Sequence, residues 1–213
     1  MSGLKNILSL LLVLGFLSGF ALAEDQPSLP QYRSVLKEWT RHKQWYSPVT
    51  MQAEMLWHAT YFSPEFRHAQ EQETIKRKYL DPVEASVYIA QQEKKQSAYE
   101  EFFVGLYTIK AYREFSLGKS SFWETVLVKE DGEEIFPVGI EPIEIRPFEK
   151  ILYPYLGRWD KGYRVLFPKS NLNKFSLVLR SVVGETKLKW DSATTSKSHP
   201  LEILDDAGST PGE

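Results

Sequence analysis

The stretch that decides the predicted fold is FSLVLRSVVGETKLKW, residues 175–190. Apolar side chains occupy every second position before Gly184 and again after it, with polar side chains between most of them. This alternation is typical of half-buried strands, because successive side chains of a strand point to opposite faces of a sheet. Glycine supplies the positive backbone angle that a tight turn requires. We therefore predict a β-hairpin with one buried face.

Similar short runs of alternating apolar and polar residues precede this hairpin. Asp131-Gly132 marks a turn between two of these runs. The predicted strands lie at residues 102–108, 123–128, 135–138, 143–146, 163–167, 175–180 and 186–190. About seven strands at this spacing are typical of an antiparallel sandwich, in which two sheets bury their inner faces against each other. We predict an immunoglobulin-like β-sandwich over residues 101–190. The chain has no cysteine, so the disulfide of antibody domains is absent.

The residues before these strands have the periodicity of helices. Between residues 32 and 39 the apolar side chains recur at spacings of three and four, which marks one face of a helix. A second helix, the most apolar, is predicted over residues 49–61. The chain is therefore predicted to be an α+β protein. Its N-terminal helical subdomain, residues 24–100, would pack on the C-terminal antiparallel sandwich.

Two further helices have clear start signals. Ser63 and Asp81 are each followed by a proline. A serine or aspartate oxygen accepts a hydrogen bond from the first helical turn, and proline at the first position loses no hydrogen bond. In the second of these helices we expect Val83, Val87 and Ala90 to face inward.

The first 23 residues have the pattern of a signal peptide. Lys5 gives a positive start, residues 7–20 are almost entirely apolar, and residues 21–23 fit the small-x-small rule of signal peptidase. The apolar run is shorter than the roughly 20 residues of a spanning helix, which favours cleavage over a retained anchor, although both remain open. We expect a periplasmic or secreted protein whose polar tail, residues 191–213, is disordered.

The composition and the absence of motifs exclude several functions. The chain carries 26 Lys and Arg against 28 Asp and Glu, without a concentrated basic stretch, so nucleic acid is not an expected partner. No phosphate-binding glycine loop, dinucleotide fingerprint or nucleophile elbow occurs, and a cysteine nucleophile is excluded. We predict no cofactor and no catalytic residues, and whether the protein is an enzyme stays open, with a non-catalytic role favoured.

Residues 147–162 contain the densest unusual chemistry of the chain. We select as candidate binding residues Tyr153, Tyr155, Arg158, Trp159 and Asp160. Aromatic rings beside charged groups can stack on sugar faces or anchor a partner, while Arg and Asp give directional hydrogen bonds. The alternative is that this segment covers one end of the sandwich and its rings fill the core beneath, which is common for aromatics under loops.

Histidines offer one further arrangement. Glu54 and His58 are four residues apart within the predicted helix 49–61, and His68 follows in the next helix. Three such ligands could hold zinc, but the spacing matches no zinc motif, and we favour a Glu–His surface pair or a histidine at a helix interface. No metal site is predicted.

Three segments carry a resemblance: residues 59–66 (ATYFSPEF), residues 101–108 (EFFVGLYT) and residues 153–155 (YPY). With them, most of residues 45–190 resembles a group of small exported bacterial proteins with no known activity. The resemblance implies export and a layout of helices followed by strands. We expect a structural or binding protein of the bacterial cell envelope, with a protein or polysaccharide partner. The alternatives are a sugar or peptidoglycan binder that uses residues 147–162, and a polymer hydrolase.

Overall fold

The computed structural model describes residues 30–46, 51, 53–109, 117, 123–182 and 184–191. Its elements are α1 (Pro30–Trp39), β1 (Thr40–Tyr46), β2 (Ala53–Tyr61), α2 (Pro64–Lys78), α3 (Pro82–Ala98), β3 (Tyr99–Thr108), β4 (Glu124–Lys129), β5 (Glu134–Ile135), β6 (Gly139–Ile143), α4 (Pro147–Leu152), β7 (Lys161–Pro168), β8 (Lys174–Ser181) and β9 (Gly184–Asp191). The predicted signal peptide, and the predicted tail beyond residue 191, lie outside the described residues.

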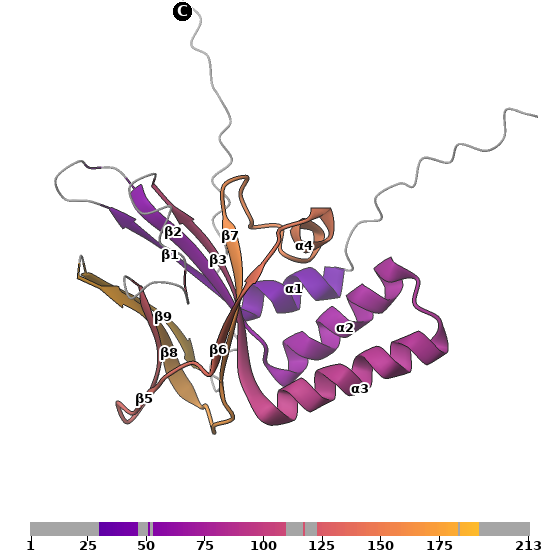
Figure 1. Cartoon of the computed structure of the whole chain (residues 1–213). Coiled ribbons are helices and arrows are strands. Elements are labelled where there is room, and N and C mark those ends of the chain that lie inside the picture. The colour runs from indigo at the N-terminus through magenta and orange to yellow at the C-terminus, as the bar shows by residue number, and fades with distance from the viewer. Residues whose placement is uncertain are drawn as a thin grey trace, which may run out of the picture.

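The strands form two antiparallel sheets, so the mixed α+β class is confirmed. The five-stranded sheet has the order β1-β2-β3-β7-β6, and the four-stranded sheet has the order β5-β4-β8-β9. Helices α1, α2 and α3 lie together on one side of the five-stranded sheet, and the four-stranded sheet lies on the other (Figure 1). None of the helices in the described part of the chain is long and apolar enough to cross a membrane.

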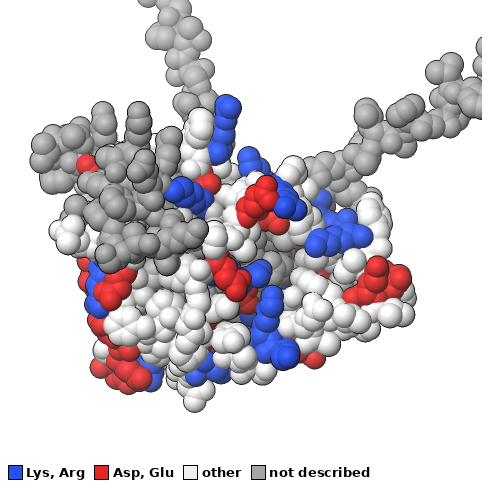
Figure 2. Space-filling model, viewed as in Figure 1, with Lys and Arg blue, Asp and Glu red and all other residues white. Residues whose placement is uncertain are grey.

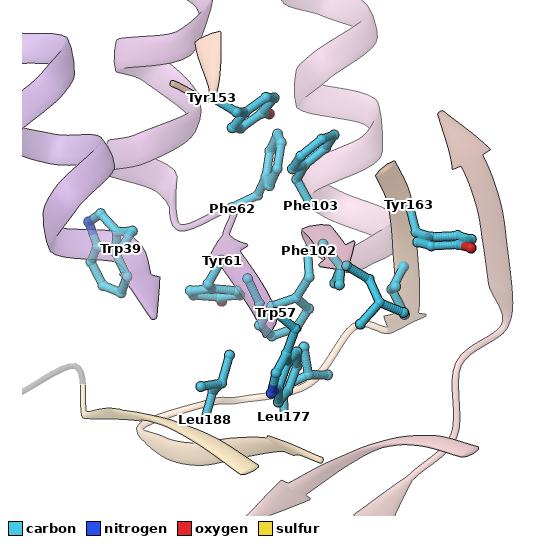
Figure 3. Close-up of a cluster of buried hydrophobic side chains, with 14 of the residues drawn as sticks. Trp39, Trp57, Tyr61, Phe62, Phe102, Phe103, Tyr153, Tyr163, Leu177 and Leu188 are labelled. Carbon is cyan, nitrogen blue, oxygen red and sulfur yellow. The ribbon is translucent and has the colours of Figure 1, made fainter. Parts of the chain in front are cut away.

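Side chains from both sheets meet in one hydrophobic core. Figure 3 shows Trp57 and Leu177, which come from different sheets, within this cluster. The indole nitrogen of Trp57 donates to the Thr186 hydroxyl at 3.3 Å, and that of Trp190 donates to the Trp39 carbonyl at 3.0 Å. Both tryptophans therefore bury their rings while their polar atoms keep a partner.

The predicted hairpin at the end of the chain is confirmed. β8 and β9 pair from Lys174 with Asp191 to Ser181 with Gly184. Gly184 has a φ of 145°, which a residue with a side chain rarely adopts. The buried face carries the alternating residues named by the pattern, Phe175, Leu177, Leu179, Thr186, Leu188 and Trp190. Alternation alone was sufficient here because one face of this sheet is buried.

The predicted helix over residues 49–61 is wrong, because Ala53–Tyr61 is the strand β2. Met55, Trp57, Ala59 and Tyr61 are buried, one at every second position. A spacing of four, as between Met55 and Ala59, fits one face of a helix and one face of a strand equally well. Trp57 is completely buried between Met55 and Ala59, and aromatic residues favour strands.

The face of α3 that was predicted to turn inward is exposed. Val83 and Val87 are 71% and 53% exposed. The opposite side of the helix lies over buried charges, and there Gln92 accepts a hydrogen bond from Arg67 at 3.4 Å. Lys95 is half-buried. Its pKa is lowered mainly by burial and to a smaller extent by the charge of Arg164. The charged layer beneath α3 therefore decides its orientation, against the apolar pattern.

The predicted helix starts at Ser63 and Asp81 are confirmed. The Ser63 hydroxyl accepts from the backbone N–H of Phe66 at 3.0 Å. Asp81 caps α3, and Glu84 accepts in return from the Asp81 backbone N–H. These local bonds depend on only four consecutive residues, which is why sequence alone reveals them.

Strands from both predicted subdomains join the same sheet. β1 and β2 pair with each other, and β2 pairs with β3 over seven residue positions, from Met55 with Thr108 to Tyr61 with Phe102. β3 begins at Tyr99 and continues to Thr108, across the predicted boundary at residue 100. The short helix α4, Pro147–Leu152, is an additional element within the candidate segment 147–162.

Candidate functional site

The segment between α4 and β7, residues 153–160, is called the cap loop below, and it packs on Gly105 of β3. Gly105 of β3 and Gly162 of β7 are direct partners in the five-stranded sheet. A methyl group at Gly105 would lie only 2.6 Å from Leu156 Cδ2 of the cap loop. Because Gly105 has no side chain, the loop packs directly on the backbone of the sheet.

A cleft of about 460 Å³ opens between the cap loop and the edge of this sheet. β6 is the edge strand, and it pairs with β7 from Gly139 with Leu166 to Ile143 with Gly162. The described residues that line the cleft are Leu117, Ile140, Pro142, Ile143, Ile145, Lys150, Gly157, Arg158, Asp160, Lys161, Gly162 and Tyr163. The cleft falls within the roughly 300–1,000 Å³ of typical small-molecule sites.

The polar residues of the cleft carry mainly positive charge. Lys150, Arg158 and Lys161 face one acid, Asp160, among the described lining residues. Lys150 and Arg158 are exposed, and Lys161 is half-buried. The remaining lining is largely aliphatic. A surface of this composition can hold a ligand that combines an apolar face with negative charge, because the cations supply hydrogen-bond donors at the rim.

Asp160 fixes the shape of the cap loop. Its Oδ2 accepts a hydrogen bond from the backbone N–H of Gly157 at 2.9 Å. Burial raises the pKa of this carboxyl, while the Gly157 N–H and the charge of Lys150 act in the opposite direction. Asp160 thus holds the turn closed, and it contributes an acceptor to the cleft.

Tyr153 belongs to the core rather than to a binding surface. It is 3% exposed, and its ring stacks on Phe103 with the centroids 3.8 Å apart (Figure 3). Its hydroxyl accepts from the Gln70 side-chain amide at 2.7 Å. Burial raises the pKa of this tyrosine well above its usual value. The ring therefore joins α2 to the sheet beneath the cap loop.

Tyr155 is half-buried and holds the other side of the loop to the sheet. Its hydroxyl forms a 2.7 Å hydrogen bond with the Thr60 hydroxyl, which in turn lies 2.8 Å from the Thr40 hydroxyl. Its ring stacks on His58 at a centroid distance of 4.8 Å. Burial raises the pKa of Tyr155. Both tyrosines of the candidate set therefore have structural contacts to β-strands.

Trp159 is the exposed ring of the candidate set, at 62% exposure. The guanidinium of Arg158 lies 5.1 Å from its ring centroid, a distance at which a cation is attracted to an aromatic face. Of the five predicted binding residues, Arg158 and Asp160 line the cleft, and Trp159 lies between them in the chain. The exposed row of three rings that a sugar-binding platform would need is not formed, since Tyr153 is buried.

Sequence reasoning missed several lining residues of the cleft. Lys150 and Lys161 lie inside the candidate segment 147–162 but carry no motif that marks them. Ile140 and Ile143 come from β6, which the pairing with β7 brings to the cap loop. That pairing is a tertiary contact, so no local pattern could have placed these residues at the site. Ile143 began the strand predicted at residues 143–146, whereas Ile140 was in no predicted strand.

The histidine arrangement considered from sequence does not assemble. Glu54 and His58 lie on the strand β2, where residues four apart are separated by roughly 13 Å. His68 is exposed on the separate helix α2. Among the described residues, no three His, Cys, Asp or Glu side chains gather closely enough to hold a metal ion. His58 instead lies beside His42 of β1, at a ring-centroid distance of 5.4 Å.

Acidic and basic side chains are interspersed over the coloured part of the face shown in Figure 2. No extended patch of one sign covers the described residues in that view. Duplex-binding proteins ordinarily present a continuous basic face, and the described residues show none in this view.

Comparisons of this chain with protein-family models, with curated proteins and with solved structures gave no match.

Proposed function

We propose that this chain is an exported, non-catalytic binding protein of the bacterial cell envelope that holds a negatively charged segment of an envelope polymer in the cleft beside the cap loop. The observation that carries this proposal is the lining of the cleft, where Lys150, Arg158 and Lys161 surround aliphatic side chains. Export rests on the signal-peptide pattern of residues 1–23.

Acidic sugars and the stem peptides of peptidoglycan combine carboxylates with apolar faces. A carboxylate of such a ligand would accept hydrogen bonds from the cations at the rim, and charged hydrogen bonds are about twice as strong as neutral ones. The exposed ring of Trp159, between the lining residues Arg158 and Asp160 in the chain, offers a flat surface to a partner. The ligand class that fits is therefore an anionic, partly apolar polymer segment.

Binding is a better proposal than hydrolysis for this cleft. Glycosidic bonds are ordinarily cleaved by two carboxyl groups about 5–9.5 Å apart. Among the described residues that line the cleft, Asp160 is the one carboxylate, and it is bonded to the backbone of Gly157. The charges that gather there suit the recognition of an anion.

The fold supports a recognition role. We propose that the two sheets form a sandwich of the immunoglobulin-like kind, with the helical layer as an additional N-terminal part. The support is the core that the two sheets share, in which the Trp57 indole donates to Thr186 across the interface. Such scaffolds bind their ligands through loops at the ends of strands. The cap loop lies in such a place, directly before β7. The resemblance to small exported bacterial proteins agrees with this proposal.

The test is a titration of the purified protein with soluble peptidoglycan fragments that carry free carboxylates, followed by calorimetry. The double variant Lys150→Ala/Arg158→Ala removes two cations of the cleft and is expected to weaken binding at least about tenfold, because each charged hydrogen bond contributes about 1.5–3 kcal/mol. The matched control is Lys187→Ala/Lys189→Ala, which removes two exposed lysines of β9. It should bind like the unchanged protein.

Two results would overturn the proposal. One is the absence of binding by the unchanged protein to any anionic fragment. The other is an equal loss of affinity in both double variants, since that outcome would reflect net charge rather than the cleft. Trp159→Ala gives an independent check: its exposed ring makes a large loss of stability unexpected, so reduced affinity at an unchanged melting temperature supports contact with the ligand.

A further inference from the structure

His42 and His58 face each other across two neighbouring strands. They are direct partners in the antiparallel pairing of β1 and β2. Directly opposed residues of such a pair have Cβ atoms about 4.5–5.5 Å apart. The two imidazole rings lie with centroids 5.4 Å apart and planes inclined by 30°. His42 is exposed and His58 is half-buried, so the pair lies at the border between solvent and sheet.

This separation is the one that two imidazole ligands of one metal ion need. A tetrahedral metal ion that holds two imidazole nitrogens at about 2.0–2.1 Å places the ring centres roughly 5 Å apart. The rings of His42 and His58 already have this distance. They also lie on adjacent, hydrogen-bonded strands, so little backbone movement is required for both to reach one ion.

The surroundings of His58 hold its ring in place. Tyr155 stacks on it at 4.8 Å with an angle of 18° between the planes. Its Nδ1 is buried and has no hydrogen-bond partner among the described residues. The ring therefore keeps its position beside His42.

We propose that His42 and His58 together bind one divalent transition-metal ion at the face of β1 and β2 that carries both rings, with water at its remaining positions. Imidazole nitrogen is a ligand suited to Zn²⁺, Ni²⁺ and Cu²⁺ and not to Mg²⁺ or Ca²⁺. No third acidic or histidine ligand joins the pair within the described part of the chain, so exchangeable water completes the coordination. Affinity follows the order of ligand preference, with Cu²⁺ bound more tightly than Ni²⁺ or Zn²⁺.

The site could not be recognised from the sequence. His42 and His58 are separated by 16 residues, and only the register of β1 against β2 brings them together. The predicted helix over residues 49–61 placed His58 with Glu54 instead. The inference is independent of the cleft beside the cap loop, because neither histidine lines that cleft.

The test is calorimetric titration of the tag-free protein with Zn²⁺, Cu²⁺ and Mg²⁺ in separate experiments. We expect one equivalent of Cu²⁺ and one of Zn²⁺ to bind, with Cu²⁺ tighter, and no uptake of Mg²⁺. His42→Ala should lower the affinity for Zn²⁺ at least about tenfold, since even the loss of an outer partner of a ligand costs about 10–100-fold. His42 is exposed, so this variant should fold normally.

The matched control is His68→Ala, which removes an exposed histidine of α2 and should leave the titration unchanged. Zinc should also raise the melting temperature of the unchanged protein and of His68→Ala, but not that of His42→Ala. The proposal is overturned if the unchanged protein takes up neither Zn²⁺ nor Cu²⁺. It is equally overturned if His42→Ala binds as tightly as the unchanged protein, because the ion would then lie elsewhere.

Discussion

Arg67 of α2 and Glu101 of β3 form an ion pair that is almost completely buried. The Arg67 Nη2 lies 2.9 Å from the Glu101 Oε2, and the two side chains are 2% and 1% exposed. The other oxygen of Glu101 lies 2.7 Å from Nε of Arg164, on β7. One carboxylate therefore pairs with two guanidinium groups between the helical layer and the five-stranded sheet.

Glu101→Gln is expected to destabilise the protein strongly. The amide keeps the size of the side chain but removes its charge, so Arg67 stays buried without its ion-pair partner, and such losses cost about 3–5 kcal/mol. The free energy of unfolding, measured in urea, checks this value. The control is Glu144→Gln, which breaks the exposed pair between Glu144 and Arg146 and should cost less than about 1 kcal/mol. Equal effects of the two substitutions would contradict the prediction.

Gly105→Ala is expected to displace the cap loop. The added methyl group would lie 2.6 Å from Leu156 Cδ2, so the loop must move or the strand must shift, at a cost of about 1–3 kcal/mol. Loop displacement should also weaken ligand binding in the cleft. Gly139→Ala is the matched control, because its methyl group would meet Leu166 at an ordinary distance of 3.7 Å. A melting temperature that falls equally in both variants would refute this account.

Tyr153→Phe is expected to lower stability by about 1–3 kcal/mol, because the Gln70 amide loses its partner in a buried place. The stacking of the ring on Phe103 would remain, so the effect isolates the hydroxyl. Tyr46→Phe provides a control, since that hydroxyl bonds to Gln44 on the surface and Tyr46 is 55% exposed. Chemical unfolding of both variants should show a clear loss for the first and almost none for the second.

The parts of the fold that depend on local physics were predictable from sequence. The hairpin of β8 and β9 follows from alternation around Gly184, and the helix starts follow from Ser63 and Asp81. Each signal involves a few consecutive residues. At the hairpin and at the two helix starts, the tertiary contacts agree with the local preference. The hairpin and the two helix starts were therefore predicted correctly, whereas the strand predicted at residues 143–146 was wrong, because β6 covers Gly139–Ile143.

The remainder depended on partners that lie far away in the chain. β2 looked helical because a spacing of four suits both structures, and only its pairing with β1 and β3 decides between them. The orientation of α3 is set by Arg67 and Glu101 beneath it, which no pattern within α3 reports.

The candidate segment 147–162 contains residues in different surroundings, which its sequence does not distinguish. Arg158 and Asp160 line the cleft, whereas Tyr153 is core. The residue type alone does not tell whether an aromatic side chain is buried or exposed.

His58 should make stability depend on pH between about 6.5 and 4. In the folded protein its pKa is lowered to about 4 by burial and by His42, against a usual value of 6.5 in the unfolded chain. The unfolded state therefore binds the proton more readily, so this contribution is fully present above pH 6.5 and is lost as the pH falls to 4. The largest loss is about 3 kcal/mol.

The comparison that isolates this contribution is between the unchanged protein and His58→Gln, with a chelator present to exclude metal. Carboxylates titrate in the same range in both proteins, so the difference in unfolding free energy between them reports His58. The unchanged protein should lose up to about 3 kcal/mol more than His58→Gln between pH 7 and pH 4. His68→Gln, on the exposed surface of α2, should follow the unchanged protein. Identical pH profiles for the unchanged protein and His58→Gln would show that the His58 ring accepts its proton as easily in the folded state as in the unfolded one.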